Sequence, residues 1–378
     1  MTLFINAANL RFGGGKTVGF NIINYYINNP HIKRIIITAP ATCGYERFQE
    51  NERVKIIFFP VIFNVSVLKI VSNYFVLPLL LLLNKTDFVL SLGNVAIPTD
   101  KPQFLLIHQP FLAYPESVVW KRMKESDKKF HFYISNMVRF IKSNLKYANE
   151  VGVQTEAMRS RLHRLYNIPL KKLHVSPNAI SFTSSNNHYE VATDNTSENI
   201  KLLFLSKYYP HKNFEILYEV GEIIKARNLP LKIFVTIDAQ ENTGSRKFLE
   251  NIISMKLDQY IVNLGNVLLE DVPKVYSQHD GLFLPTFLES FSGTYIEAMH
   301  FGKPVFTSDM DFAHEVCQDA AFYFNQVDKY DIIETIMSAY NDRETMQFKV
   351  QRGRELIAQS KSWDEIGQFI DKQILNLN

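Results

Sequence analysis

The sequence of 378 residues is poor in cysteine, in excess charge and in long uninterrupted apolar runs. Its two cysteines, Cys43 and Cys317, lie far apart and near no cluster of histidines, so no disulfide framework and no zinc site is indicated. Subtracting 38 acidic from 41 basic residues leaves a net charge of +3, too small for nucleic-acid binding through bulk charge. We therefore expect a protein of the reducing cytoplasm that binds no nucleic acid.

Membrane-spanning segments are also not indicated. The N-terminus lacks the pattern of a signal peptide. The most apolar stretch covers residues 58–83, but polar side chains interrupt it and leave only 74–83 continuous, which is too short to cross a bilayer. Two interpretations remain for this stretch: a buried strand followed by a core helix, which we favour, or shallow contact with a membrane surface.

The residues that are present have the composition of an ordinary globular protein, with 46% hydrophobic and 21% charged. Short apolar runs alternate with amphipathic segments in two similar halves, which predicts two doubly wound α/β domains facing a cleft. The expected strands are Leu3–Ala7, Ile35–Ala39, Val54–Phe59, Phe88–Ser91, Phe104–His108, Lys201–Ser206, Leu231–Ile237, Ile261–Leu264, Gly281–Pro285 and Pro304–Ser308.

A segment rich in Asn, Ser and Thr separates the halves. We predict a first domain over residues 1–180, a linker over 181–199 and a second domain over 200–362. Since ligands of open α/β sheets bind at the carboxyl ends of the strands, the loops after the apolar runs are the candidate site.

The first such loop contains Gly13, Gly14 and Gly15, followed by Lys16 and Thr17. It fails the Walker A pattern because Leu10 stands where that pattern needs a glycine. It also fails the dinucleotide fingerprint, because Val18 stands where that motif needs a glycine. Two interpretations stay open: close approach of the backbone to an anionic ligand, which we favour, and a plain tight turn.

A second loop carries Glu289 and Glu297, eight residues apart, in the segment Leu284–Met299, with Gly302-Lys303-Pro304-Val305 following. This spacing resembles the Glu-x7-Glu signature of family-4 retaining glycosyltransferases, which have the GT-B fold. The resemblance covers most of the chain and is densest over residues 201–324. It implies two Rossmann-like domains, with residues 363–378 crossing back to the first, and a nucleotide-diphosphate sugar as donor.

The resemblance also implies roles for residues near this signature. Glu289 would contact hydroxyls of the donor sugar, and Glu297 would accept hydrogen bonds from the nucleotide ribose. If a helix begins near Ser292, the amides of Phe291, Ser292, Gly293 and Thr294 would hold the leaving diphosphate through partial charge. Ser290 and Ser292 stand where the family often has glycine, which leaves the donor sugar undefined.

Three further residues match family positions. Lys207 and Lys212 flank a turn after the first strand of the second half and would neutralise the donor diphosphate, although the first position is more often Arg. His108 closes an apolar strand of the first half, where its ring would bind a donor hydroxyl or position the acceptor.

Metal and membrane contacts are less well indicated. Asp309-Met310-Asp311 mimics a metal-binding Asp-x-Asp motif, but we reject that interpretation because short patterns recur by chance; we expect no metal and no cofactor. A basic amphipathic pattern is either a solvated helix, slightly favoured, or a face attracted to anionic lipid. Its cations are Lys121, Arg122, Lys124, Lys128, Lys129, Arg139, Lys142 and Lys146.

The resemblance implies a retaining glycosyltransferase that moves a hexose-type sugar, with UDP favoured over GDP or dTDP as the carrier, to a glycan hydroxyl. We expect a lipid-linked acceptor of bacterial surface polysaccharide synthesis at the inner face of the cytoplasmic membrane. Two alternatives are a sugar-nucleotide epimerase on the same fold and a non-catalytic subunit that binds nucleotide sugar.

Overall fold

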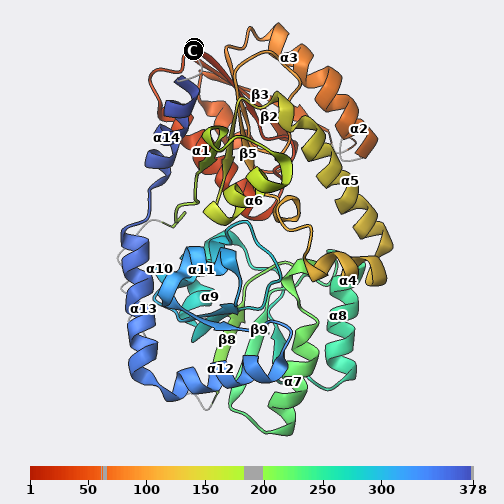
Figure 1. The fold of residues 1–378 in the computed structure, drawn as a ribbon, viewed down its shortest axis with the longest axis vertical. Helices are drawn as coiled ribbons and strands as arrows, with labels where there is room; N and C mark the ends of the chain where they lie inside the picture. The colour runs from red at the N-terminus through yellow and green to blue at the C-terminus, as the bar shows by residue number, and fades with distance from the viewer. Residues whose placement is uncertain (61, 63–65, 183–198, 376–378) are drawn as a thin grey trace. The chain divides into compact units, whose positions relative to one another are not determined.

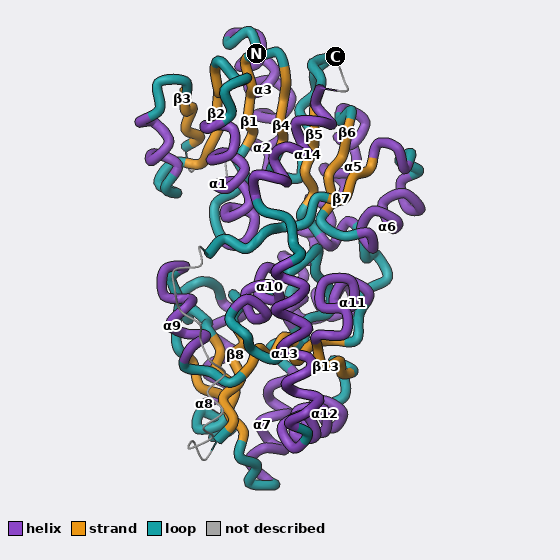
Figure 2. The backbone as a smooth tube through the Cα atoms, turned by 90° about the vertical axis from the view of Figure 1, so that its left-hand side faces the viewer, coloured by secondary structure: helices purple, strands orange, loops and turns teal. Residues whose placement is uncertain are grey.

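A computed structural model describes residues 1–60, 62, 66–182 and 199–375. Contacts divide the chain into two compact units (Figures 1 and 2). Unit 1 comprises Met1–Pro115, Lys129–Ser181 and Lys361–Asn378, and unit 2 comprises Glu116–Lys128 and Phe182–Ser360. The expected linker over 181–199 falls almost entirely outside the described residues.

Unit 1 is built on a seven-stranded parallel sheet in the order β3-β2-β1-β4-β5-β6-β7. The order reverses between β1 and β4, so the loops after these strands diverge at the carboxyl edge. The strands are β1 (Thr2–Asn6), β2 (Arg34–Pro40), β3 (Val54–Phe59), β4 (Phe88–Ser91), β5 (Gln103–Ile107), β6 (Glu150–Val153) and β7 (Leu173–Val175).

Unit 2 repeats this design with a six-stranded parallel sheet in the order β10-β9-β8-β11-β12-β13. Here the order reverses between β8 and β11. The strands are β8 (Ile200–Phe204), β9 (Leu231–Val235), β10 (Ile261–Asn263), β11 (Gly281–Leu284), β12 (Val305–Ser308) and β13 (Ala321–Phe324).

Helices cover both sheets, because both faces of a parallel sheet are apolar and must be buried. Unit 1 has α1 (Gly13–Asn28), α2 (Ser66–Val71), a π-helical turn (Ser72–Val76), α3 (Leu77–Leu83), most of α5 (Lys128–Asn144), α6 (Glu156–Tyr166) and α14 (Trp363–Leu375). Unit 2 has α4 (Val118–Ser126), α7 (Ile216–Ala226), α8 (Thr243–Ser254), α9 (Val272–Ser277), α10 (Gly293–His300), α11 (Asp311–Cys317), α12 (Lys329–Asn341) and α13 (Arg343–Ala358). No helix among the described residues is both long and apolar enough to cross a bilayer.

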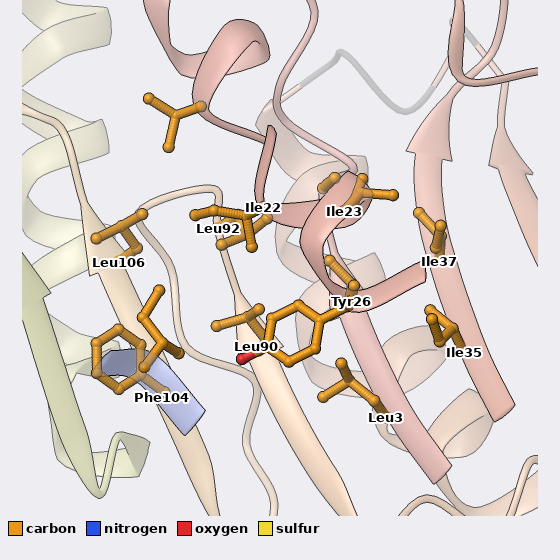
Figure 3. Close-up of a cluster of buried hydrophobic side chains, with 14 of the residues drawn as sticks. Leu3, Ile22, Ile23, Tyr26, Ile35, Ile37, Leu90, Leu92, Phe104 and Leu106 are labelled. Atoms are coloured by element: carbon orange, nitrogen blue, oxygen red, sulfur yellow. The ribbon is translucent and has the colours of Figure 1, made fainter. Parts of the chain in front are cut away.

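Alternating side chains of the unit 1 strands supply two cores. Leu3 and Ile35 face one side, where they pack with Ile22 and Tyr26 of α1 and with buried residues of α14 (Figure 3). Phe4 packs on the opposite side with residues of α3. The period of two along each strand therefore separates a core under α1 and α14 from a core under α3.

Residues Glu116–Lys128 belong to unit 2, although they lie within the first domain that we expected over residues 1–180. Arg122 of α4 explains this assignment. Its Nη1 donates to Oδ1 of Asn213 at 3.1 Å, and its guanidinium lies 4.5 Å from the ring centroid of Phe287. The basic segment is therefore divided between the units, with Lys121, Arg122, Lys124 and Lys128 in unit 2.

The packing of α14 on α1 gives a stability prediction. A Cβ at Gly367 would lie 2.3 Å from Cγ of Tyr25, whose hydroxyl donates to Asp371 at 2.6 Å. Gly367→Ala must therefore displace Tyr25 or α14, and we expect it to lower the free energy of unfolding by about 1–3 kcal/mol in urea titrations.

Gly14→Ala is the matched control for this substitution. A Cβ at Gly14 would meet no atom within 4 Å. Because Gly14 lies in the first turn of α1, alanine there should leave the stability unchanged or raise it by about 0.5–1 kcal/mol. Equal stability of the two variants would contradict the described packing of α14.

Candidate functional site

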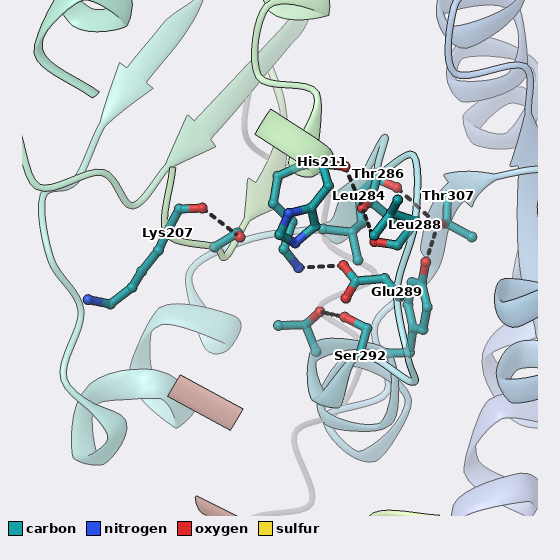
Figure 4. Close-up of polar contacts among 12 residues, drawn as sticks. Lys207, His211, Leu284, Thr286, Leu288, Glu289, Ser292 and Thr307 are labelled. Atoms are coloured by element: carbon teal, nitrogen blue, oxygen red, sulfur yellow. Dashed lines mark hydrogen bonds and ion pairs between the residues drawn. The ribbon is translucent and has the colours of Figure 1, made fainter. Parts of the chain in front are cut away.

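Two loops of unit 2 meet where the strand order reverses. The loop after β8 contains the 3-10 turn η7 (Pro210–Lys212), and the loop after β11 leads into α10. The carbonyl of His211 accepts a hydrogen bond from Oγ1 of Thr286 at 2.9 Å and another from the amide of Phe287 at 2.8 Å (Figure 4). These two bonds hold the lysine-bearing turn against the glutamate-bearing loop.

Lys212 and Glu289 form an ion pair across these loops. Nζ of Lys212 donates to Oε1 of Glu289, the contact marked at Glu289 in Figure 4. Only 14% of the lysine side chain and 9% of the glutamate side chain are exposed. Since a charge this deeply buried needs a partner, each side chain compensates the charge of the other.

Lys207 has a partner that the sequence did not indicate. Its Nζ donates to Oε1 of Glu241 at 2.8 Å, in the loop after β9. The second carboxylate oxygen of Glu241 is buried and has no hydrogen-bond partner among the described residues. The general rule that ligands bind at strand ends pointed to this loop, but no motif singled out Glu241.

The helix α10 begins at Gly293, one residue after the expected start at Ser292. Ser292 adopts φ +63°, a left-handed conformation that is strained for a residue with a Cβ, and its Oγ lies 3.0 Å from Oγ1 of Thr294. Helix geometry leaves the first amides of α10 without partners inside the helix. This helix start follows Glu289 directly, so amide dipoles lie in the same loop as the ion pair.

Glu297 lies in the second turn of α10. Its side chain is partly buried, and this burial raises its pKa to about 7. No described residue donates a hydrogen bond to its carboxylate in this structure. A carboxyl group in this state can bind hydroxyl donors when it ionises, which occurs near neutral pH.

The remaining expected site residues belong to unit 1. His108 follows β5; its Nε2 donates to the carbonyl of Leu92 at 3.0 Å and its amide donates to Oδ1 of Asn94 at 2.6 Å. Burial lowers the pKa of His108 to about 4, against the opposing effect of hydrogen bonds with Leu92 and Gln154. The ring is therefore neutral at pH 7 and can act only through hydrogen bonds.

Gly13, Gly14 and Gly15 form the first turn of α1, at the end of the loop after β1. Gly13 adopts φ +62°, which favours glycine there for backbone reasons alone. A Cβ at Gly13 or Gly14 would meet no atom within 4 Å, whereas one at Gly15 would lie 3.3 Å from Leu10. Both earlier interpretations of this loop, ligand approach and tight turn, remain compatible with this geometry.

The aspartates of the Asp-x-Asp pattern have partners within unit 2. Asp309 Oδ1 lies 2.5 Å from Nε2 of His314, and Asp311 Oδ1 accepts from the amide of Phe312 at 2.8 Å. Within the described part of the chain, no group of three or more His, Cys, Asp or Glu side chains could hold a metal ion.

The structure thus brings Lys212 and Glu289 together beside the loop that carries Phe291, Ser292, Gly293 and Thr294 and leads to Glu297, whereas Lys207 of the same loop as Lys212 pairs with Glu241 instead. It adds Glu241, Thr286 and Asn213. Asn213 is fully buried, has φ +60° and ends η7, and its Nδ2 donates to the carbonyl of Gln326 at 2.8 Å. The sequence signal for this residue was an asparagine directly after a predicted turn, because asparagine tolerates the left-handed conformation better than most residues.

Comparisons with known proteins agree with this geometry. Residues 188–356 match the family described as glycosyl transferases group 1. Over 278 residues the chain is 23% identical to RfbU, the O-antigen chain mannosyltransferase of Salmonella typhimurium, with 72% of this chain and 69% of RfbU covered.

Solved structures share the fold. HepE of Anabaena, in complex with UDP and glucose, matches with a TM-score of 0.71 at 14% identity over all of both chains. WaaG, a glycosyltransferase involved in lipopolysaccharide biosynthesis, matches with a TM-score of 0.71 at 13% identity over 99% of each chain. The predicted GT-B architecture, with two Rossmann-like units and a C-terminal helix on the first, is confirmed. Residues 188–356 are therefore similar to the glycosyl transferases group 1 family, and the chain has the GT-B fold.

Proposed function

We propose that this protein transfers a hexose-type sugar, with retention of configuration and without a metal ion, from a nucleotide-diphosphate sugar to a hydroxyl of a lipid-linked glycan. UDP is the favoured carrier, and the acceptor belongs to bacterial surface polysaccharide synthesis at the inner face of the cytoplasmic membrane. The observation that carries this proposal is the buried Lys212–Glu289 pair at the reversal of strand order in unit 2, directly before the start of α10.

The proposed chemistry is a displacement at the anomeric carbon of the donor sugar. Its bond to the diphosphate oxygen breaks, its bond to the acceptor oxygen forms on the same face, and the acceptor proton leaves with the diphosphate. No protein nucleophile is needed, so the protein orients both partners and stabilises the departing charge. Lys207, Lys212 and the first amides of α10 would face the diphosphate, Glu289 the sugar hydroxyls and Glu297 the ribose.

His108 and the glycines of unit 1 also have proposed roles: His108 would bind a donor hydroxyl or position the acceptor, and Gly13, Gly14 and Gly15 would bind the donor. A neutral His108 would bind a sugar hydroxyl rather than a phosphate, since its ring carries no charge at pH 7. The loop of Gly13, Gly14 and Gly15 leaves open space for a ligand beside the start of α1.

Two measurements test this proposal. Nucleotide sugars are first screened by thermal shift, and the stabilising donor is then incubated with and without lipid-linked glycan while free nucleotide is measured. Release that requires the acceptor and persists in EDTA supports the proposal. An epimerase would convert the donor without acceptor, and a non-catalytic subunit would bind it without release.

A further inference from the structure

The helices between β3 and β4 expose a continuous apolar stripe. Side chains three or four residues apart lie on one face of a helix, and here that spacing repeats through α2, the π-helical turn and α3. Phe75 and Leu82 are 72% and 71% exposed. The exposed side chains of the stripe are Val67, Ile70, Val71, Phe75, Leu79, Leu82 and Leu83.

The opposite face of the same helices is part of the core. Leu77 and Leu81 are buried against Phe4 and Ile36 of the sheet. The favoured interpretation of this stretch as a core helix is thus right for one face and wrong for the other. A helix that is apolar on both faces can bury only one of them within this unit. Large exposed apolar patches mark contact surfaces.

Helix α5 lies beside the stripe. Nδ2 of Asn73 donates to Oδ1 of Asn144 at 3.2 Å, and the rings of Tyr74 and Phe140 pack edge to face with their centroids 6.2 Å apart. Figure 1 shows α5 running alongside α2 and α3. Nζ of Lys69 lies 6.0 Å from the ring centroid of Tyr133. The apolar stripe and the exposed side of α5 therefore form one surface, which we call the docking face.

The charges of the docking face are all positive. Residues 53–86 and 128–149 contain no Asp or Glu, although the whole chain has 38 acidic residues. Between residues 66 and 86 and between 129 and 149, the cations are Lys69, Lys85, Lys129, Arg139, Lys142 and Lys146. Such a combination of exposed apolar and only basic side chains is complementary to an anionic lipid surface.

We infer that the docking face binds the surface of an anionic lipid bilayer. The apolar stripe enters the boundary between headgroups and acyl chains, while the cations of α5 contact lipid phosphates. This inference deepens the proposed function, on which it rests, by assigning the membrane contact to α2, α3 and α5. A second copy of the chain fits less well, because a two-fold contact would place cations opposite cations.

Sedimentation with vesicles of phosphatidylcholine, with or without phosphatidylglycerol, tests the docking face. We expect the full chain to bind only the phosphatidylglycerol vesicles, and less at high salt. Phe75→Ser with Leu82→Ser should weaken binding at least about tenfold. Lys129→Gln with Arg139→Gln should weaken it about fivefold for each charge removed.

Matched controls lie in unit 2. Ile253→Ser with Phe348→Ser removes similarly exposed apolar side chains, and Arg246→Gln with Lys247→Gln removes two exposed cations of α8. Both should leave vesicle binding unchanged. All variants should keep the thermal shift produced by the stabilising nucleotide sugar, because none alters a proposed donor-binding residue.

Several outcomes would overturn the inference: no binding of the unaltered chain to phosphatidylglycerol vesicles, equal binding by the docking-face variants, or a dimer that Phe75→Ser with Leu82→Ser dissociates. Vesicle binding that depends on the docking face, in a chain that binds no nucleotide sugar, would instead refute the proposed function and leave the docking face supported.

Discussion

Lys212→Gln should lower kcat about a thousandfold. The ammonium of Lys212 is the cation held closest to Glu289, and in the proposed reaction it faces charge that develops on the leaving diphosphate. Loss of one preorganised donor of this kind typically costs a factor of about 100 to 1,000. The measurement is the rate of acceptor-dependent nucleotide release at saturating donor.

Stability must be separated from chemistry in this experiment, since Lys212→Gln also leaves the buried Glu289 carboxylate without its cation. Lys212→Gln combined with Glu289→Gln removes both charges, so we expect it to regain stability in urea titrations but not turnover. Lys274→Gln, at an exposed lysine of α9, is the control and should keep the normal rate. A near-normal rate for folded Lys212→Gln would refute the proposed role.

Glu297 should make the stability of the ligand-free protein fall as pH rises from about 4.5 to above 7. Burial raises its pKa from 4.5 to about 7, so between these values the folded protein holds a proton that the unfolded chain has released. Stability falls with pH wherever the folded state binds more protons. The shift corresponds to about 3 kcal/mol.

Glu297→Gln removes this titration. At pH 8 we expect the variant to be more stable than the unaltered protein by about 3 kcal/mol, and at pH 5 to be nearly equal to it. Glu250→Gln, at an exposed residue of α8, is the control and should not change the pH dependence of unfolding. Parallel stability curves for Glu297→Gln and the unaltered protein would contradict the described burial.

Donor binding should show the opposite pH dependence, because only the ionised Glu297 carboxylate accepts two hydrogen bonds from a ribose. Because the pKa of Glu297 is about 7, we expect the stabilising nucleotide sugar to bind about tenfold more weakly at pH 6 than at pH 8. Glu297→Gln should bind weakly at both pH values. This residue would then lower the stability of the empty protein while strengthening donor binding.

Much of the fold could be predicted because its signals are local. Most predicted strands are apolar runs whose side chains are largely buried within a parallel sheet, and all ten occur in the structure within a few residues of their expected bounds. The strands β6, β7 and β13 were not predicted. They are as short as β4, β10, β11 and β12, which were predicted, so length does not explain the difference; Gly152 of β6 and His174 of β7 interrupt the apolar runs there.

Alone, the sequence determined the fold class and the Glu-x7-Glu loop at the start of a helix, because apolar periodicity and residue spacing act over short distances along the chain. The tertiary structure decided which groups pair and which faces remain exposed. It paired Lys207 with Glu241 and Lys212 with Glu289, assigned α4 to unit 2 and left one side of α2 and α3 uncovered. Burial and ion pairing depend on contacts between residues distant in sequence, so no local pattern encodes them.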